Sequence, residues 1–300
     1  MTDPVRPQLF RIYTDYDTEE IFDMPQQLLS ISGMGMPSVS NLTVATPYQH
    51  GETFLGFVVR PRLLQIAFHL SDLWGARAWD GYGTRQRLIN ILNPTVAPFY
   101  FELVMNNGDL YTLEKVYFEA GFEAGLPQSQ GNSNKQGVAV RLRCGWPFWL
   151  GEDYTLTSSL AAGAQTFACE TYGNFYSWPE ITLTGPLTLP IVYLMRWDTA
   201  TAAVAEVAHI GINATNAAGE HVYITTRPTE VAVIDDNGDT VALTADSTFC
   251  NFVLTPHPIR YLHDLQSNAS WYNNFIRVTA SAYGVGASVE VTHSDHWSGI

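Results

Sequence analysis

Apolar and polar residues alternate along most of this chain, and a period of two predicts β-strands. The alternation is clear in residues 138–144, where one face carries Val138, Val140, Leu142 and Cys144. Asn-Gly pairs at 107–108 and 237–238 each lie between alternating segments. Such pairs favour the tight turns of β-hairpins, because they tolerate positive φ angles. The pattern therefore predicts a mainly β protein with at least two hairpins.

One segment has the signals of a helix. In residues 83–94 we expect Thr84 to be the N-cap and Pro94 to terminate the helix. One side of this helix would carry Leu88, Ile91 and Leu92. The alanine-rich residues 199–214 fit either a helix or a strand, because alanine favours helix while the surrounding pattern favours strand.

The chain has 300 residues, which is comfortable for two domains. The strand pattern breaks between Leu150 and Gly173, where Gly, Pro, Ser and Ala are frequent, and then resumes. We therefore expect one β-rich domain at residues 1–155 and a second at 156–300. A long polar segment at 125–137 is expected to be a functional loop.

Charge and cysteine usage exclude several classes of function. The chain has 29 acidic and 15 basic residues, a net charge of −14, which disfavours sequence-specific binding to nucleic acid. No apolar run approaches the ~18 residues of a membrane-spanning helix, and the N-terminus lacks the apolar core of a signal peptide. Three scattered cysteines without a CxxC pair argue against a disulfide framework and against a zinc finger.

The ending "HSDHWSGI" raises the question of a metal or acid–base site. In a strand, His293 and Asp295 point to one face and His296 to the other, so the two histidines cannot converge on one ion. We expect His293 and Asp295 to form a hydrogen-bonded pair at the end of the strand. No nucleophile elbow, phosphate loop, HExxH or dinucleotide motif is present. The sequence therefore predicts no enzyme, no catalytic residue, no metal site and no cofactor.

The order of segments in the first half is informative. A Pro-x-x-x-Gly segment from Pro47 to Gly51 precedes a strand with Arg60 and a helix with Arg85 that ends in Asn-Pro. A two-stranded hairpin at 99–118 follows, and a strand with a Pro-aromatic ending closes this half. The order resembles the N-terminal domain of distal tail proteins from long-tailed phages with siphovirus-type tails.

The second half is similar to the same family in its order of segments. It restarts at residues 172–186 with a strand that ends in Gly-Pro, continues through 219–239 and finishes with two strands in 274–300. One departure concerns the turn before the penultimate strand. Family members have a Pro-Gly-x-Asn turn there, whereas this chain has "SNASWYNNF" at 267–275.

The resemblance implies a fold, a function and a set of partners. The N-terminal domain would form a homohexameric ring. The C-terminal domain would be a galectin-like β-sandwich outside the ring. The ring would join the tail tube to the baseplate or tail tip in the virion, after assembly in the host cytoplasm. Partners would be the tail tube protein, a tail-associated hub protein and receptor-binding or side-fibre proteins. DNA would pass through the lumen without specific binding, because acidic surfaces repel it.

Six residues are candidates for the ring or partner interface. Four come from the family-like segments, and two come from the 99–118 hairpin, whose strands we expect to be free edges that pair across subunits. The candidates are Pro47, Gly51, Arg60, Arg85, Tyr100 and Glu102. The alternative hypothesis is a carbohydrate- or receptor-binding module that uses the Trp-rich second half, and a β-rich hydrolase ranks third.

Overall fold

The fold is mainly β, as the alternation predicted. The computed structural model describes residues 7–14, 17–24, 28–45, 51–71, 81–95, 98–121, 135–160, 163–169, 171, 173–198, 203–249, 251–256 and 274–300. The chain divides into two compact units, Met1–Gly151 with Trp297–Ile300, and Glu152–His296. This division differs from the expected one at 155/156 mainly at the C-terminus, because the last four residues return to the first unit.

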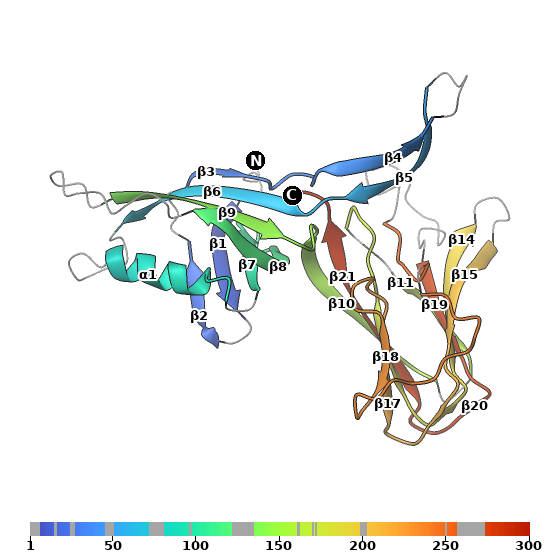
Figure 1. Ribbon diagram of the computed structural model, residues 1–300. Coiled ribbons are helices and arrows are strands. Elements are labelled where there is room, and N and C mark those ends of the chain that lie inside the picture. Colours follow the sequence, from blue (N-terminus) through green and yellow to red (C-terminus); the bar gives the residue numbers. More distant parts are fainter. Residues whose placement is uncertain are drawn as a thin grey trace. The chain divides into compact units, whose positions relative to one another are not determined.

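The strands of the first unit pair in the order β2-β1-β7-β8-β9-β6-β3, and all of these pairings are antiparallel (Figure 1). The β4 and β5 strands form a separate two-stranded hairpin between β3 and β6 in the chain. The bounds are β1 Pro7–Thr14, β2 Asp17–Asp23, β3 Leu28–Ser32, β4 Val39–Val44, β5 Thr53–Val59, β6 Arg62–Ser71, α1 Gly81–Ile91, β7 Phe99–Met105, β8 Leu110–Gly121 and β9 Lys135–Cys144.

The core of the first unit follows from the alternation. Alternate side chains of β6 and β9 are buried with those of α1: Leu64, Ile66 and Phe68 in β6, and Val138, Val140, Leu142 and Cys144 in β9. The helix contributes the three residues expected of it, Leu88, Ile91 and Leu92. The helix begins at Gly81, however, so the expectation that Thr84 is its N-cap is wrong.

The second unit contains two main sheets that share one core. Strands β18-β17-β12-β21-β10 form one sheet, β11-β19-β14-β15 form the other, and a small sheet has the order β16-β13-β20 (Figure 1). Buried residues of both main sheets pack together, which is the organisation of a β-sandwich. The bounds are β10 Trp149–Ser159, β11 Gln165–Cys169, β12 Glu180–Thr184, β13 Leu187–Thr188, β14 Ile191–Asp198, β15 Ala203–Gly211, β16 Thr215–Asn216, β17 His221–Thr225, β18 Ala232–Asp235, β19 Asn274–Thr279, β20 Ala282–Tyr283 and β21 Ser288–Trp297.

Several local expectations are decided by these elements. Both Asn-Gly turns are confirmed, since Gly108 N donates to Met105 O and Gly238 N donates to Asp235 O, each at 3.0 Å. The ambiguous alanine-rich segment forms the strand β15, because pairing with β14 satisfies its backbone hydrogen bonds despite the helix propensity of alanine. Of the predicted functional loop at 125–137, residues 125–134 lie outside the described residues.

The expectation of free edges in the 99–118 hairpin is wrong. Strand β7 pairs with β1 on one side and with β8 on the other. Strand β8 in turn pairs with β9, and also meets β10 through Leu150 and Thr112. Both strands of the hairpin are therefore interior to the sheet, and they cannot pair across subunits through an open edge.

Candidate assembly surface

The β4–β5 hairpin exposes an unusual number of large apolar side chains. Phe54 is 59% exposed, Leu55 67% and Phe57 44%, values typical of charged surface residues rather than phenylalanine and leucine. Four further apolar residues of the hairpin are at least 36% exposed: Val39, Leu42, Val44 and Val58. We call the seven residues named here the hairpin apolar surface.

Both faces of the hairpin carry these residues. Cross-strand partners lie on the same face, so the pair Asn41–Phe57 belongs to one face and the next pair, Leu42–Gly56, to the other. The register shifts between Leu42 and Thr43, which places Leu55 in an irregularity of the ladder. A two-stranded hairpin is marginally stable alone in water, and this one has no polar face to leave in solvent. Its composition is that of a buried element.

The base of the hairpin is held by Arg60, one of the predicted interface residues. Its backbone N–H donates to Ser38 O at 2.8 Å, and its Nε donates to Ser40 Oγ at 2.7 Å. Arg60 itself is exposed. It therefore closes the end of β5 onto the start of β4 and leaves its guanidinium at the surface.

A buried arginine, Arg62, begins the next strand and is only 2% exposed. Its Nε donates to Pro147 O at 2.7 Å and its Nη2 to Ser298 O at 2.7 Å. Its Nη1 is shared by three consecutive carbonyls, those of Gly33 at 2.6 Å, Met34 at 3.2 Å and Gly35.

The charge of Arg62 is stabilised without a carboxylate. The guanidinium carbon lies 5.5 Å from the centre of the Trp149 ring, within the range of a cation–π contact. Among the described residues no acidic side chain forms an ion pair with it, so the carbonyl dipoles supply the negative potential. Burial lowers the pKa of Arg62 to about 10, which leaves it charged at neutral pH.

The other predicted interface residues are dispersed. Pro47 lies outside the described residues, Gly51 is exposed just before β5, and Arg85 lies in α1. Tyr100 stacks on Tyr13 at a ring distance of 5.0 Å, and Glu102 pairs with Arg11 at 3.1 Å, both within the β1–β7 pair. Of the five candidates that the structure describes, Gly51 and Arg60 adjoin the hairpin apolar surface. Sequence inspection missed the surface itself, although its apolar run is visible in "TFLGFVV" at 53–59.

The C-terminal histidines are buried, and Nδ1 of His296 lies 3.0 Å from Ser294 O. His293 is 2% exposed and His296 5%, and neither ring nitrogen of His293 has a hydrogen-bond partner. The expected His293–Asp295 hydrogen bond is therefore absent. The His293 ring stacks on Tyr154 at 5.6 Å instead. Burial lowers the pKa of each histidine to about 4, so both are neutral at pH 7.

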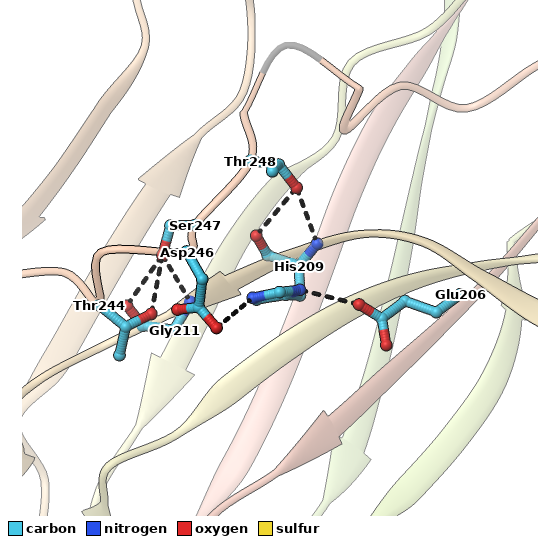
Figure 2. Close-up of polar contacts among 7 residues, drawn as sticks. All are labelled: Glu206, His209, Gly211, Thr244, Asp246, Ser247 and Thr248. Atoms are coloured by element: carbon cyan, nitrogen blue, oxygen red, sulfur yellow. Dashed lines mark hydrogen bonds and ion pairs between the residues drawn. The ribbon is translucent and has the colours of Figure 1, made fainter.

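His209 on β15 lies between two carboxylates, those of Glu206 and Asp246 (Figure 2). Its Nδ1 lies 2.8 Å from Glu206 Oε1, and its Nε2 lies 3.1 Å from Asp246 Oδ2. The Glu206 hydrogen bond is the main cause of a raised His209 pKa. Ser247 Oγ bonds to the backbone of β15 rather than to His209, so no nucleophile–base pair is formed. The contacts instead fasten residues 244–248 along β15.

Other classes of site find no support among the described residues. They contain no cluster of three or more His, Cys, Asp or Glu side chains with the geometry to hold a metal ion. No helix within the described ranges is long and apolar enough to span a membrane. The five tryptophans in those ranges are buried or half-buried, so none forms the exposed ring platform that a sugar-binding module would use.

Comparisons with known proteins show which solved structures the chain resembles. No protein-family model and no curated protein matches the sequence. Among solved structures, the chain is similar to the Dit protein of phage SPP1, described as a paradigm of hub adsorption apparatus in phages that infect Gram-positive hosts. The TM-score is 0.57 at 11% identity, over 96% of this chain and 99% of that one. A chain of the phage P2 baseplate with Ca matches at a TM-score of 0.48 and 8% identity, over 95% of this chain and 97% of that one.

At such low identity, the likeness to SPP1 Dit is a likeness of fold. It extends over nearly the full length of both chains, so both units take part in it. The order of segments noted in the sequence thus has a counterpart in three dimensions.

Proposed function

We propose that this chain is a structural protein of a phage tail tip, which assembles into a ring between the tail tube and the baseplate. The hairpin apolar surface carries the proposal. Seven large apolar side chains on both faces of a two-stranded hairpin need a partner to cover them. The fold shared with a phage hub protein makes a further copy of the chain the partner that fits best.

The proposed ring requires a heterologous contact. In it, the hairpin of each copy packs on a different surface of the neighbouring copy. Such a heterologous contact generates a closed ring when the rotation between neighbours closes. Six copies is the number that the family resemblance suggests. The ring would be built by the first unit, with the second unit outside it.

The proposed role is that of a hub rather than an enzyme. The ring would contact the tail tube protein, a tail-associated hub protein and receptor-binding or side-fibre proteins, and would let DNA pass through its lumen. The net charge of −14 per copy supports passage without adhesion, because negative surfaces repel the phosphate backbone. The alternative of a sugar-binding module has no exposed tryptophan in the described structure to support it.

The double substitution Phe54→Ser and Phe57→Ser is expected to abolish assembly. A neighbour can bury only the exposed half of each phenylalanine, which contributes about 1 kcal/mol, so two serines weaken each contact between neighbours by about 2 kcal/mol, roughly thirtyfold in affinity. The wild-type chain should sediment as a ring-sized oligomer at micromolar concentration, and electron microscopy should show a central hole. The double variant should sediment as a monomer with an unchanged circular dichroism spectrum.

Val285→Ser is the matched control, because Val285 is 93% exposed but belongs to the second unit. This variant should assemble like the wild type. A wild-type chain that stays monomeric over the full concentration range and is missing from purified tail tips would overturn the proposed function. Assembly that survives the double substitution would reject the hairpin as the interface.

A further inference from the structure

The last four residues of the chain, Trp297–Ile300, form part of the first unit although they follow the second. The Trp297 ring meets Tyr111 edge-on, at a centroid distance of 6.1 Å and an interplanar angle of 89°. Ser298 O accepts the hydrogen bond of Arg62 Nη2, and Ile300 N donates to Met34 O at 3.4 Å. We call Trp297–Ile300 the C-terminal segment.

The close approach of this segment depends on glycine. A Cβ placed on Gly299 would lie 2.8 Å from the backbone carbon of Gly35 and 2.8 Å from Met36 N. Real Cβ atoms do not come so close to backbone atoms, and backbone cannot move aside as a flexible side chain can. The C-terminal segment is thus packed directly on the main chain of residues 33–36.

The residues under the C-terminal segment lead into the hairpin. Strand β3 ends at Ser32 and β4 begins at Val39, so residues 33–38 are the connection on the β4 side. Three consecutive carbonyls of this connection accept hydrogen bonds from Arg62, which also holds the C-terminal segment through Ser298. The other connection, from β5 to β6, consists of Arg60 and Pro61 and ends at Arg62 itself. Arg62 therefore ties both ends of the hairpin to the C-terminus.

We propose that the C-terminal segment positions the β4–β5 hairpin for ring closure, acting through Arg62 and residues 33–36. This inference rests on the proposed function, because it assigns a determinant of the same assembly surface. The physical basis is preorganisation. A hairpin that is held in one orientation binds its neighbour without first losing conformational freedom, whereas a loosened one binds with an affinity reduced by the fraction correctly placed.

The segment is well placed for this role because it contributes little to either buried core. Its removal leaves the Arg62 hydrogen bonds to Pro147 and to residues 33–35 available. The buried cluster of the first unit contains Trp149, Phe101 and the β6 and β9 side chains, and only Trp297 of the C-terminal segment packs against it. The second unit has a separate core. Loss of residues 298–300 is therefore expected to free the hairpin while both cores remain folded.

The test is deletion of Ser298–Ile300 from the otherwise full-length chain. Hydrogen exchange should be faster in residues 33–44 and 53–59, and unchanged in β6 and β9. Assembly measured by sedimentation should require a concentration at least about tenfold higher than the wild type. Gly299→Val should have the same two effects, since it displaces the segment without shortening the chain. Ile300→Ser is the matched control and should behave like the wild type, because it keeps the backbone N–H and alters a side chain that is 37% exposed.

Two measurements separate this inference from the proposed function. If the wild-type chain does not assemble, the proposed function is wrong, while hydrogen exchange in the hairpin still decides whether the C-terminal segment positions it. If the deletion and Gly299→Val variants show wild-type exchange in the hairpin, the inference is wrong even when rings form. Unfolding of β6 and β9 in both variants would also overturn it, because the segment would then be part of the core.

Discussion

Replacing Arg62 with leucine is expected to destabilise the first unit by about 3–5 kcal/mol, the cost of leaving the buried partners of an ion unsatisfied. The substitution removes the donors for the carbonyls of Pro147 and Ser298 and for three carbonyls of residues 33–35. Backbone carbonyls cannot be replaced along with the arginine, so an apolar residue of similar volume does not restore the balance. The measurement is the free energy of opening of β6 and β9 from native-state hydrogen exchange, because two units do not unfold in one transition.

Arg60→Leu is the control for this experiment. Arg60 lies two positions earlier, is exposed, and donates from its side chain to a single hydroxyl, Ser40 Oγ. Its replacement should cost less than about 1 kcal/mol, the usual size of an effect at the surface. Arg62→Lys should destabilise the first unit less than Arg62→Leu and more than Arg60→Leu. A single ammonium group cannot reach all the carbonyls that the three guanidinium nitrogens bind. Equal effects of Arg62→Leu and Arg60→Leu would contradict the structural role given to Arg62.

The second unit is expected to lose stability as the pH falls from about 6.5 to about 4. Burial lowers the pKa of His293 and of His296 to about 4 in the folded state, whereas an unfolded histidine titrates near 6.5. Between these values the unfolded state binds more protons, so acid favours unfolding. The loss is roughly 1.4 kcal/mol per pH unit for each proton, or about 3 kcal/mol per histidine over the whole interval. The free energy of opening of β12 and β19, from native-state hydrogen exchange at pH steps between 7 and 4.5, measures this slope.

His293→Phe should make the dependence of stability on pH less steep, by the contribution of one titrating histidine. The two ring nitrogens of His293 have no hydrogen-bond partner, so phenylalanine loses no bond and keeps the stack on Tyr154. The slope, rather than the absolute stability, is the readout, because strain from the larger ring does not change with pH. His209→Gln is the control. The pKa of His209 is raised, so its contribution is present below pH 6.5 and is lost as the pH rises through the folded value, opposite in sign to that of the buried histidines. A steep acid slope that persists in His293→Phe would show that other groups cause it.

Much of the local structure was determined by the sequence itself. Strict alternation in segments such as 138–144 leaves one face apolar, and that face has to be buried for the strand to form a sheet. Asn-Gly pairs specify hairpin turns because the needed backbone angles are local. The family-like order of segments predicted a mainly β chain, and the chain is similar in fold to a phage hub protein over nearly its whole length. The alternation and the hairpin turns depend on neighbours in the sequence, and they were predicted correctly.

The candidate site depended on neighbours in space. The segment "RPRLL" holds two arginines, and nothing in it distinguishes Arg60, which is exposed, from Arg62, which is buried. The difference arises from carbonyls at residues 33–35, at 147 and at 298, the last of them 236 positions away in the chain. The sequence predicted that β7 is a free edge, but β1 pairs with it. It also predicted a hydrogen bond between His293 and Asp295, but the ring nitrogens of His293 have no hydrogen-bond partner. Sequence determined which residues are apolar at 53–59, but only the tertiary structure decided that nothing in the described chain covers Phe54, Leu55 and Phe57, because exposure is set by how distant segments pack.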